Sequence, residues 1–312
     1  MSHPNVYPVR PDQAAHSLID MAGYQRMYEQ SISDPETFWG EQAEQFLGFF
    51  QPWSKVFSGD FSKADVAWFK DAKLNACWNC VDRHLPQRAD QTALIWEGDE
   101  PDDSLLISYR DLHQAVCRLA NVLKLRGIKK GDRVCIYMPM IPEAVYAMLA
   151  CARIGAIHSV VFGGFSPDAI KDRIQDSDCQ SVITANQGLR GGKVIPLKDN
   201  VDKALTQCPN VHSVVVVKRT DAPVNWQQGR DIWYHDAIDQ VDDQCPAEVM
   251  DAEDPLFILY TSGSTGKPKG VLHTTAGYLL SAAITHKYIF DYHEGDIFWC
   301  SADVGWVTGH SY

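Results

Sequence analysis

The stretch DRVCIYMPMIPEAVYAMLACARIGAIHSVVF, residues 132–162, sets the architecture of the chain. Its first part, 132–138, is a short apolar run rich in β-branched side chains, which is typical of a buried strand. A helical pattern follows from Pro142 to Ile154, with proline in the first turn, where a helix tolerates it. Residues 156–162 again have the pattern of a strand. Strand, helix and strand in this order predict a βαβ unit with parallel strands.

The same alternation continues beyond this unit. Strands are expected at 181–184, 213–217 and 256–259, and helices at 166–176, 194–207 and 274–287. The region 220–254, which contains several proline and aspartate residues, predicts a looser connection with one helix. We therefore expect an α/β fold with mostly parallel sheets flanked by helices.

The first 80 residues have a different composition, rich in tryptophan and phenylalanine. Asp34 and Pro35 predict the start of a helix, as cap and first-turn residue. We expect residues 1–80 to form an aromatic-rich N-terminal segment that packs onto a larger domain, 81–312. The chain stops at Tyr312 after a strand-like run and a glycine-bearing turn, so this larger domain is expected to be incomplete.

Composition excludes several classes of protein. The 312 residues include 28 Lys+Arg and 40 Asp+Glu, a formal net charge of −12, which argues against nonspecific binding to nucleic acid or anionic membranes. The most apolar helical stretch, 144–152, is far shorter than the roughly twenty residues of a membrane span. Nine cysteines, spread through apolar segments, indicate reduced thiols in a cytoplasmic protein. Cys77 and Cys80 have CxxC spacing without a second pair nearby, so ordinary helix cysteines are expected.

The strongest chemical signal is YTSGSTGKPKGV, residues 260–271. Its three glycines allow sharp turns that point N–H groups at an anion, and its hydroxyl groups and lysines add donors suited to a polyphosphate. The spacing is not that of a Walker A loop, because Gly263 and Gly266 are three apart and Pro268 follows Lys267. The dinucleotide fingerprint G-x-G-x-x-G is also absent from this segment.

Two further segments carry glycines beside reactive side chains. In GLRGGK, 188–193, an arginine and a lysine flank two glycines and can grip a phosphate, although a solvated basic turn has the same composition. In DVGWVTGH, 303–310, Gly305 and Gly309 imply close backbone approach, while Trp306 and Val307 can wall a small apolar pocket.

Residues 260–271 resemble the phosphate-loop signature of the adenylate-forming enzymes. Four more segments narrow the resemblance to the acetyl-CoA synthetase family across nearly the whole chain: FWGEQAEQF (38–46), NCVDRHL (79–85), VVFGGFSPDAI (160–170) and WCSADVGWVTGHSY (299–312). Enzymes of this family form an acyl-adenylate from ATP and a carboxylate, and then transfer the acyl group to CoA.

The resemblance implies roles for individual residues. The ATP phosphates would be held by Thr261, Ser262, Gly263, Ser264, Thr265, Gly266 and Lys267, with Lys267 as the catalytic cation. CoA would contact Arg190, Gly191, Gly192, Lys193, Gly163, Gly164 and Thr308, and the acyl pocket would include Trp306 and Val307. His310 is interpreted as structural, because a carboxylate substrate is already ionised at neutral pH and needs no base.

ATP, CoA and Mg²⁺ are the implied cofactors, and acetate, ATP and CoA are the implied partners, with no nucleic acid or membrane. The adenine, ribose and Mg²⁺ contacts and a C-terminal domain with the catalytic lysine are expected beyond residue 312, so the chain by itself is expected to be inactive. Thr308 favours acetate over propionate, which stays open as an alternative substrate. A non-catalytic nucleotide- or CoA-binding module is the alternative from another class.

Overall fold

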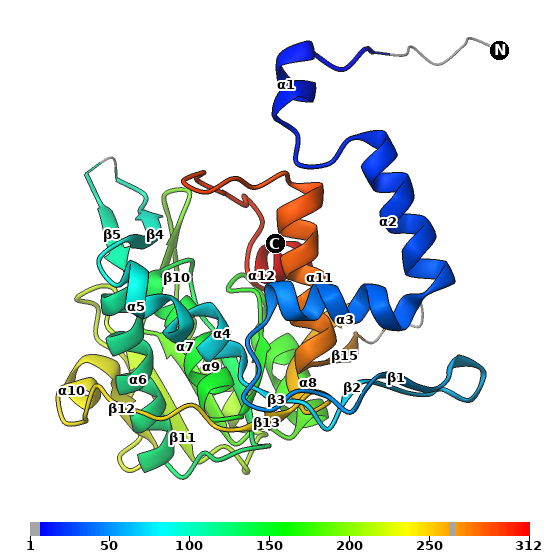
Figure 1. Cartoon of the computed structure of the whole chain (residues 1–312). Helices are drawn as coiled ribbons and strands as arrows, with labels where there is room; N and C mark the ends of the chain where they lie inside the picture. The colour runs from blue at the N-terminus through cyan, green and yellow to red at the C-terminus, as the bar shows by residue number, and fades with distance from the viewer. Residues whose placement is uncertain (1–6, 101, 262–265, 267) are drawn as a thin grey trace. The chain divides into compact units, whose positions relative to one another are not determined.

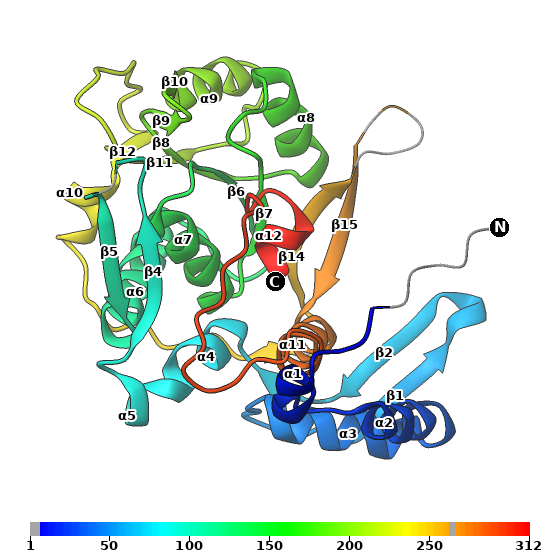
Figure 2. The same ribbon diagram turned by 90° about the horizontal axis from the view of Figure 1, so that it is seen from above.

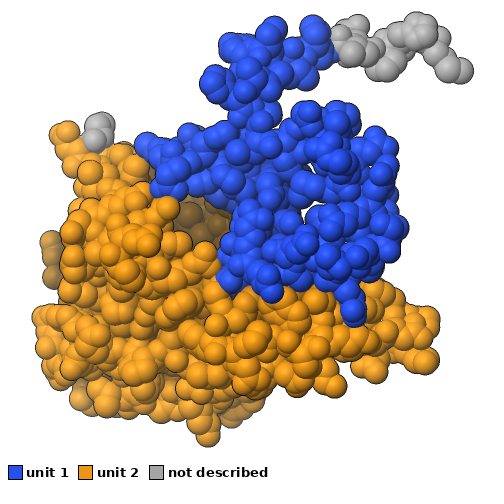
Figure 3. Space-filling view, in the orientation of Figure 1, with its two compact units in different colours: residues 1–47, 279–299 blue, residues 48–278, 300–312 orange. Residues whose placement is uncertain are grey.

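The structure is a computed structural model that describes residues 7–100, 102–261, 266 and 268–312 (Figure 1). The chain divides into two compact units, drawn in different colours in Figure 3. The first unit comprises residues 1–47 and 279–299, and the second comprises 48–278 and 300–312. Among the described residues, every helix is too short or too polar to serve as a membrane span.

The first unit is helical. It contains α1 (Pro11–His16), α2 (Met21–Ser33), α3 (Pro35–Phe46), the second half of α11 (Thr275–Ile284) and a π-helical turn (Thr285–Ile289). The predicted start of α3 is confirmed, since the Asp34 side chain accepts a hydrogen bond from the backbone N–H of Thr37. Within this unit Phe46 packs edge-on against Tyr288. The backbone N–H of Leu18 donates to the Asp291 carboxylate at 2.8 Å.

The second unit is built around a seven-stranded sheet with the order β12-β11-β8-β6-β7-β14-β15. Its strands are β6 (Arg133–Tyr137), β7 (Ile157–Val160), β8 (Ser181–Ala185), β11 (Ser213–Val217), β12 (Asp231–Trp233), β14 (Pro255–Thr261) and β15 (Lys269–Thr274). All neighbouring strands are parallel except β14 and β15, which are antiparallel. The strands β6, β7, β8 and β11 are buried almost throughout, as is typical of parallel strands. Most of their residues are apolar, but β7 contains the buried polar residues His158 and Ser159.

Helices cover both faces of this sheet (Figure 2). One face is covered by α6 (Tyr109–Leu125) and α7 (Pro142–Arg153), and the other by α8 (Pro167–Ser177) and α9 (Leu197–Leu205). Each helix begins where its sequence favours it. In α6, Ser108 and Asp111 form a capping box, and in α8 the Ser166 hydroxyl accepts from the N–H of Ala169. The layered α/β architecture predicted from the sequence is confirmed.

The second unit also contains short strands and helices outside the seven-stranded sheet and the four helices that cover it. Antiparallel pairs are β1 (Lys55–Asp60) with β2 (Asp65–Lys70), β3 (Lys73–Leu74) with β13 (Met250–Asp251), β4 (Thr92–Glu97) with β5 (Ser104–Ser108), and β9 (Gly188–Arg190) with β10 (Lys193–Ile195). Short helices are α4 (Ala76–Cys80), α5 (Leu85–Arg88), α10 (Tyr234–Ile238) and α12 (Val307–Ser311), and 3₁₀ turns lie at Phe61–Lys63 and Asp82–His84. The single helix expected within 220–254 is α10.

Three expectations about elements are wrong. The helix expected at 194–207 begins only at Leu197, because Val194 belongs to β10. The helix expected at 274–287 ends as an α-helix at Ile284. The strand-like run expected before Tyr312 is not a strand, and the last described element is the helix α12. There Gly309 lies so close to the preceding segment that a Cβ would stand 2.3 Å from the Asp303 carbonyl oxygen, an approach that an apolar pattern does not reveal.

Candidate active site

The order of the parallel strands creates a switch point between β6 and β8. The connection that leaves β6 runs to β7, whereas the connection that leaves β8 runs the opposite way to β11. In open α/β sheets, ligands bind beyond the carboxyl ends of the strands at such a point. The β9–β10 hairpin, which includes Arg190, follows β8 directly, so the phosphate-gripping segment predicted from the sequence lies at this carboxyl edge.

The two glycines of GLRGGK form the turn of this hairpin. Gly191 and Gly192 have φ angles of 54° and 73°, both in the left-handed region that a type I′ turn requires. Arg190 and Lys193 therefore face each other as cross-strand partners on either side of the turn. The arginine side chain is 59% exposed, so its guanidinium remains open to a ligand.

Phe162, which follows β7, brings two predicted site residues together. The Arg190 guanidinium carbon lies 4.7 Å from the centre of the Phe162 ring, a cation–π distance, and the Trp306 ring lies 6.3 Å from the same ring. Asp303 Oδ2 is 4.0 Å from Arg190 Nη1. No role is predicted from the sequence for Phe162 or Asp303, although they lie within the family-like segments 160–170 and 299–312.

Gly163 and Gly164 lie where the backbone turns out of the sheet. A Cβ on Gly163 would stand 3.1 Å from the Met138 carbonyl oxygen, and one on Gly164 would stand 2.5 Å from the Phe162 ring. The Gly163 carbonyl accepts a hydrogen bond from the buried Tyr137 hydroxyl at 2.9 Å. Gly163 thus lets the backbone pass close to Met138, and Gly164 leaves room for the Phe162 ring, so packing gives each glycine a structural reason.

Residues 303–310 form a turn followed by α12. The Asp303 side chain accepts from the N–H of Gly305 at 2.8 Å, and its carbonyl accepts from the N–H of Trp306 at 3.0 Å. Gly305 is required here, because a Cβ would stand 2.8 Å from the Cα and N atoms of Phe162. Trp306 and Val307 are 48% and 52% exposed. Thr308, which is also exposed, follows them on α12.

A cluster of aromatic and imidazole rings packs against His310 of α12. Phe257 on β14 is stacked on His273 at 4.4 Å and packs against His310 at 4.2 Å and Tyr278 at 4.6 Å. Burial lowers the pKa of His310 to about 4 and raises that of Tyr278 to about 12. Both side chains are therefore neutral at neutral pH, which suits a structural role.

The segment 260–271 connects two strands rather than a strand and a helix. Thr261 ends β14 and pairs with Lys269, the first residue of β15. Gly266 has a φ of 90°, which only glycine adopts readily. Ser262, Gly263, Ser264, Thr265 and Lys267 lie outside the described residues. The helix that was expected to follow the segment comes only after β15, as α11.

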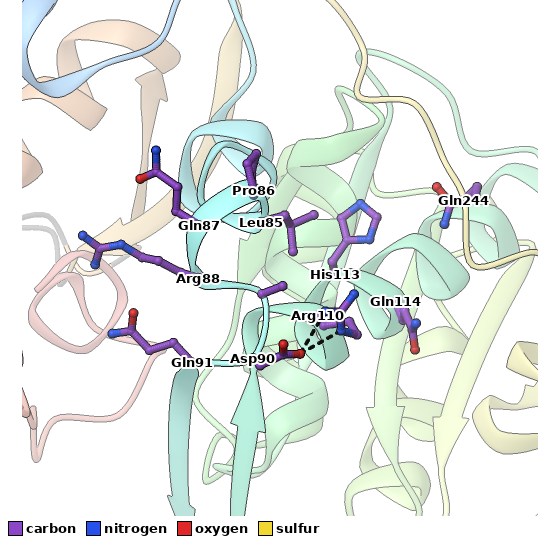
Figure 4. A pocket seen from close by; sticks show the side chains of 11 residues that line it. Leu85, Pro86, Gln87, Arg88, Asp90, Gln91, Arg110, His113, Gln114 and Gln244 are labelled. Atoms are coloured by element: carbon purple, nitrogen blue, oxygen red, sulfur yellow. Dashed lines mark hydrogen bonds and ion pairs between the residues drawn. The ribbon is translucent and has the colours of Figure 1, made fainter.

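A separate pocket of about 600 Å³ lies beside α5 and α6 (Figure 4). In Figure 4 Arg88 and Gln91 point to one side of it, while His113 and Gln114 lie on the other. Its charged walls already have partners. Arg110 pairs with Asp90 at 2.9 Å, and His113 lies 3.4 Å from Asp82. None of the described residues that are predicted to bind ATP or CoA lines this pocket.

The cysteines and the acidic residues do not gather into a metal site. All nine cysteines are free thiols, and Cys77 and Cys80 belong to the short helix α4, as expected from the sequence. Burial raises the pKa of the Cys77 thiol far above its ordinary value. Within the described part of the chain no group of three or more histidine, cysteine, aspartate or glutamate side chains could hold a metal ion.

Two family models match the chain. Residues 81–312 match the model described as AMP-binding enzyme, and residues 24–80 match the model described as acetyl-coenzyme A synthetase N-terminus. Curated relatives include acetyl-coenzyme A synthetase 2 of Pseudomonas aeruginosa, 65% identical over 99% of this chain and 48% of that protein. Acetyl-coenzyme A synthetase of Alkalilimnicola ehrlichii is 64% identical over 100% of this chain and 48% of its own length.

Acetyl-coenzyme A synthetase 2 of Pseudomonas putida is 66% identical over 98% of this chain and 47% of its own length. The chain thus spans about half the length of the curated relatives that it matches. The AMP-binding model alone covers most of the 312 residues, including the seven-stranded sheet and the three glycine-bearing segments. The chain therefore belongs to the AMP-binding enzyme family.

Proposed function

We propose that the protein to which this chain belongs is an AMP-forming acetate–CoA ligase. In the first step a carboxylate oxygen of acetate attacks the α-phosphorus of ATP, the bond to the β-phosphate oxygen breaks, and diphosphate leaves. In the second step the CoA thiolate attacks the acyl carbon, the bond to the AMP oxygen breaks, and acetyl-CoA forms. The proposal is supported by the family, by the match of residues 24–80 to the acetyl-coenzyme A synthetase N-terminus, and by the names of the relatives.

One structural observation carries the proposal. Arg190 and Trp306, from distant segments, converge on Phe162 at the carboxyl edge of the sheet. In the proposed reaction Arg190, Gly191, Gly192 and Lys193 hold the phosphates of CoA, with Gly163, Gly164 and Thr308 along its path. A cation for phosphate, beside an apolar wall for a small acyl group, is what transfer to CoA requires.

The phosphates of ATP are assigned to the segment after β14. Negative charge grows on the departing diphosphate in the first step, and preorganised N–H, hydroxyl and ammonium donors stabilise it. Thr261 to Lys267 supply such donors, with Lys267 as the cation, and Trp306 and Val307 form the acyl wall. Mg²⁺ would accompany ATP, but the described residues gather no ligand set for it, so no step is assigned to it.

The proposal extends to organisation and location. Residues 1–80 are assigned to an N-terminal segment and 81–312 to the adenylation domain, a division supported by the ranges of the two family models. The reaction is assigned to the cytoplasm, which agrees with nine free cysteines. Acetate, ATP and CoA are the proposed small-molecule partners.

The test is isotope exchange between pyrophosphate and ATP in the whole protein. We expect exchange that requires acetate but not CoA, and formation of AMP and acetyl-CoA in equal amounts once CoA is added. Propionate should give a lower kcat/KM than acetate does. A higher value with propionate would reassign the substrate. CoA or ATP binding without exchange on any short carboxylate would instead identify a non-catalytic binding module.

A further inference from the structure

Arg173, on α8, is a buried cation without an anionic partner. It is 8% exposed, and no carboxylate of the described residues lies within ion-pair distance of it. Its Nη1 donates to the Ala169 carbonyl one turn earlier at 2.8 Å. Burial lowers the pKa of its guanidinium. A charge kept inside a protein without a counter-ion is unfavourable, so another interaction must favour arginine at this position.

That interaction comes from two aromatic rings. The guanidinium carbon of Arg173 lies 4.6 Å from the centre of the Phe165 ring and 5.2 Å from the centre of the Tyr260 ring. Both distances are within the range of cation–π attraction, which is stronger in desolvated sites. The flat, delocalised guanidinium suits such stacking better than the compact ammonium of lysine does.

The two rings lie beside two different parts of the candidate site: the part proposed to bind CoA and the acyl group, and the part proposed to bind the ATP phosphates. Phe165 packs edge-on against Phe162 at 5.4 Å and against Trp306 at 6.3 Å, which places it beside the proposed CoA and acyl residues. Tyr260 immediately precedes Thr261, and its hydroxyl donates to the Asp176 carboxylate at 2.7 Å.

Five side chains thus form a continuous arginine–aromatic row: Arg190, Phe162, Phe165, Arg173 and Tyr260. The row runs from the β9–β10 hairpin to the end of β14. Its two end members belong to segments with different proposed ligands, CoA at Arg190 and the ATP phosphates after Tyr260. Arg173 is the member that contacts both halves.

We propose that Arg173 is a positioning residue that holds Tyr260, at the end of β14, and Phe165, beside the proposed CoA-binding residues, in one fixed relation. The inference rests on the proposed function. Loss of the guanidinium frees Tyr260 at one end and Phe165 at the other, so the two half-reactions suffer together although Arg173 touches neither ligand. A residue that only filled space would affect the stability of the fold and leave the two ligand constants unchanged.

The experiment compares three variants of the whole protein. Arg173→Met keeps the side-chain length and removes the charge, while Arg173→Lys keeps the charge and removes the flat stacking group. Lys171→Met is the matched control, because it removes a cation from the same helix whose partners are the exposed Asp168 and Asp172. Each variant is measured for acetate-dependent pyrophosphate exchange, for the CoA KM, and for backbone hydrogen exchange in peptides that contain 162–165 and 260–261.

For Arg173→Met we expect a rate of acetate-dependent pyrophosphate exchange about tenfold lower and a CoA KM about tenfold higher, because both ring contacts are lost. Arg173→Lys should recover part of both effects, and Lys171→Met should resemble wild type. Backbone hydrogen exchange should rise in both peptides for Arg173→Met, rise less for Arg173→Lys, and stay unchanged for Lys171→Met. A change confined to one half-reaction, or lower stability with both constants intact, would overturn the proposal.

Hydrogen exchange also separates this inference from the proposed function. If wild-type protein shows no acetate-dependent pyrophosphate exchange, the proposed function fails. Faster backbone hydrogen exchange in both peptides of Arg173→Met would then still support the positioning role. Unchanged hydrogen exchange in either peptide would overturn that role, whatever reaction the protein catalyses.

Discussion

His158 Nε2 on β7 and His310 Nε2 on α12 lie 2.8 Å apart, so one imidazole donates a hydrogen bond to the other. His158 is 3% exposed, and its Nδ1 has no partner among the described residues. His310 Nδ1 faces the Tyr278 hydroxyl and Ser311 Oγ, each at 3.3 Å. The pair joins the sheet to α12, the helix that begins directly after Trp306.

The positions of the protons follow from these partners. A proton on His158 Nδ1 would be a buried donor without an acceptor, which is less favourable than an unpaired acceptor nitrogen. We therefore assign the proton of His158 to Nε2, which donates to His310 Nε2, and the proton of His310 to Nδ1, which donates to Ser311. Both imidazoles are neutral in this arrangement.

We predict that stability falls as the pH drops below about 6.5, because of this pair. Burial lowers the pKa of His158 far below its ordinary value and that of His310 to about 4, and the groups that face His310 are His273, Tyr278 and His158. The unfolded chain takes up protons first, so the loss begins near the unfolded pKa and continues towards pH 4.

Urea unfolding at about pH 7.5 and pH 5 measures this loss. The double variant His158→Gln, His310→Gln should lose less stability between the two pH values than wild type does. His16→Gln, at an exposed position of α1, is the control and should keep the wild-type difference. An equal pH difference in wild type and the double variant would refute the assignment.

Gly305→Ala is predicted to destabilise the contact between the turn before α12 and Phe162, which follows β7. Its Cβ would stand 2.8 Å from backbone atoms of Phe162, which cannot move as a flexible side chain can, so a loss of about 1–3 kcal/mol is expected. Gly277→Ala is the matched control. It lies in α11 with no atom within 4 Å of the new Cβ, and alanine favours a helix by up to about 1 kcal/mol. Thermal unfolding should shift in opposite directions for the two.

Lys267→Ala is predicted to slow the adenylation step. Removing one positioned donor from developing phosphate charge typically costs about 3 kcal/mol, or 10²–10³-fold in rate. Acetate-dependent pyrophosphate exchange is the assay, and acyl transfer from supplied acetyl-adenylate should change much less. Lys63→Ala, beside the β1–β2 turn, controls for loss of a lysine. Wild-type exchange in the Lys267 variant would remove this residue from the mechanism.

Arg190→Ala is predicted to weaken CoA binding and to leave adenylation nearly unchanged. A hydrogen bond between charged groups contributes about 1.5–3 kcal/mol, so the CoA KM should rise about 10–100-fold. Dephospho-CoA tests which phosphate is bound: wild type should bind it more weakly than CoA, and the variant should discriminate little. Arg110→Ala, an exposed arginine paired with Asp90, is the control. Equal loss of exchange and CoA binding would indicate a folding role for Arg190.

Local sequence signals predicted much of the fold. Residues 213–217 form the expected strand, and the predicted cap Asp34 begins its helix, because apolar runs and capping side chains act within a few residues. The β9–β10 hairpin was missed, although Gly191-Gly192 between two short extended runs is itself a hairpin signal. A helical pattern that begins at Val194 overlaps the second strand of this hairpin and hides it in the sequence.

The candidate site was less predictable because its contacts join distant segments. Nothing near Phe162 in the sequence indicates that Arg190 and Trp306 lie against its ring, and nothing near Arg173 indicates Tyr260. Glycine spacing pointed to residues 188–193 and 303–310, which lie close together in the structure. Only the strand order brought them to one edge of the sheet.

The antiparallel strand β15 makes the chain prone to self-association in solution. It is the last strand of the sheet on its side, so in the described part of the chain its outer N–H and C=O groups face no further strand. Val271 and Leu272 on β15 are exposed. An open apolar edge of this kind is a template for pairing with other chains, so concentrated preparations of residues 1–312 should self-associate along β15. A lysine in place of Leu272 should keep such preparations dispersed without touching the carboxyl edge of the parallel strands.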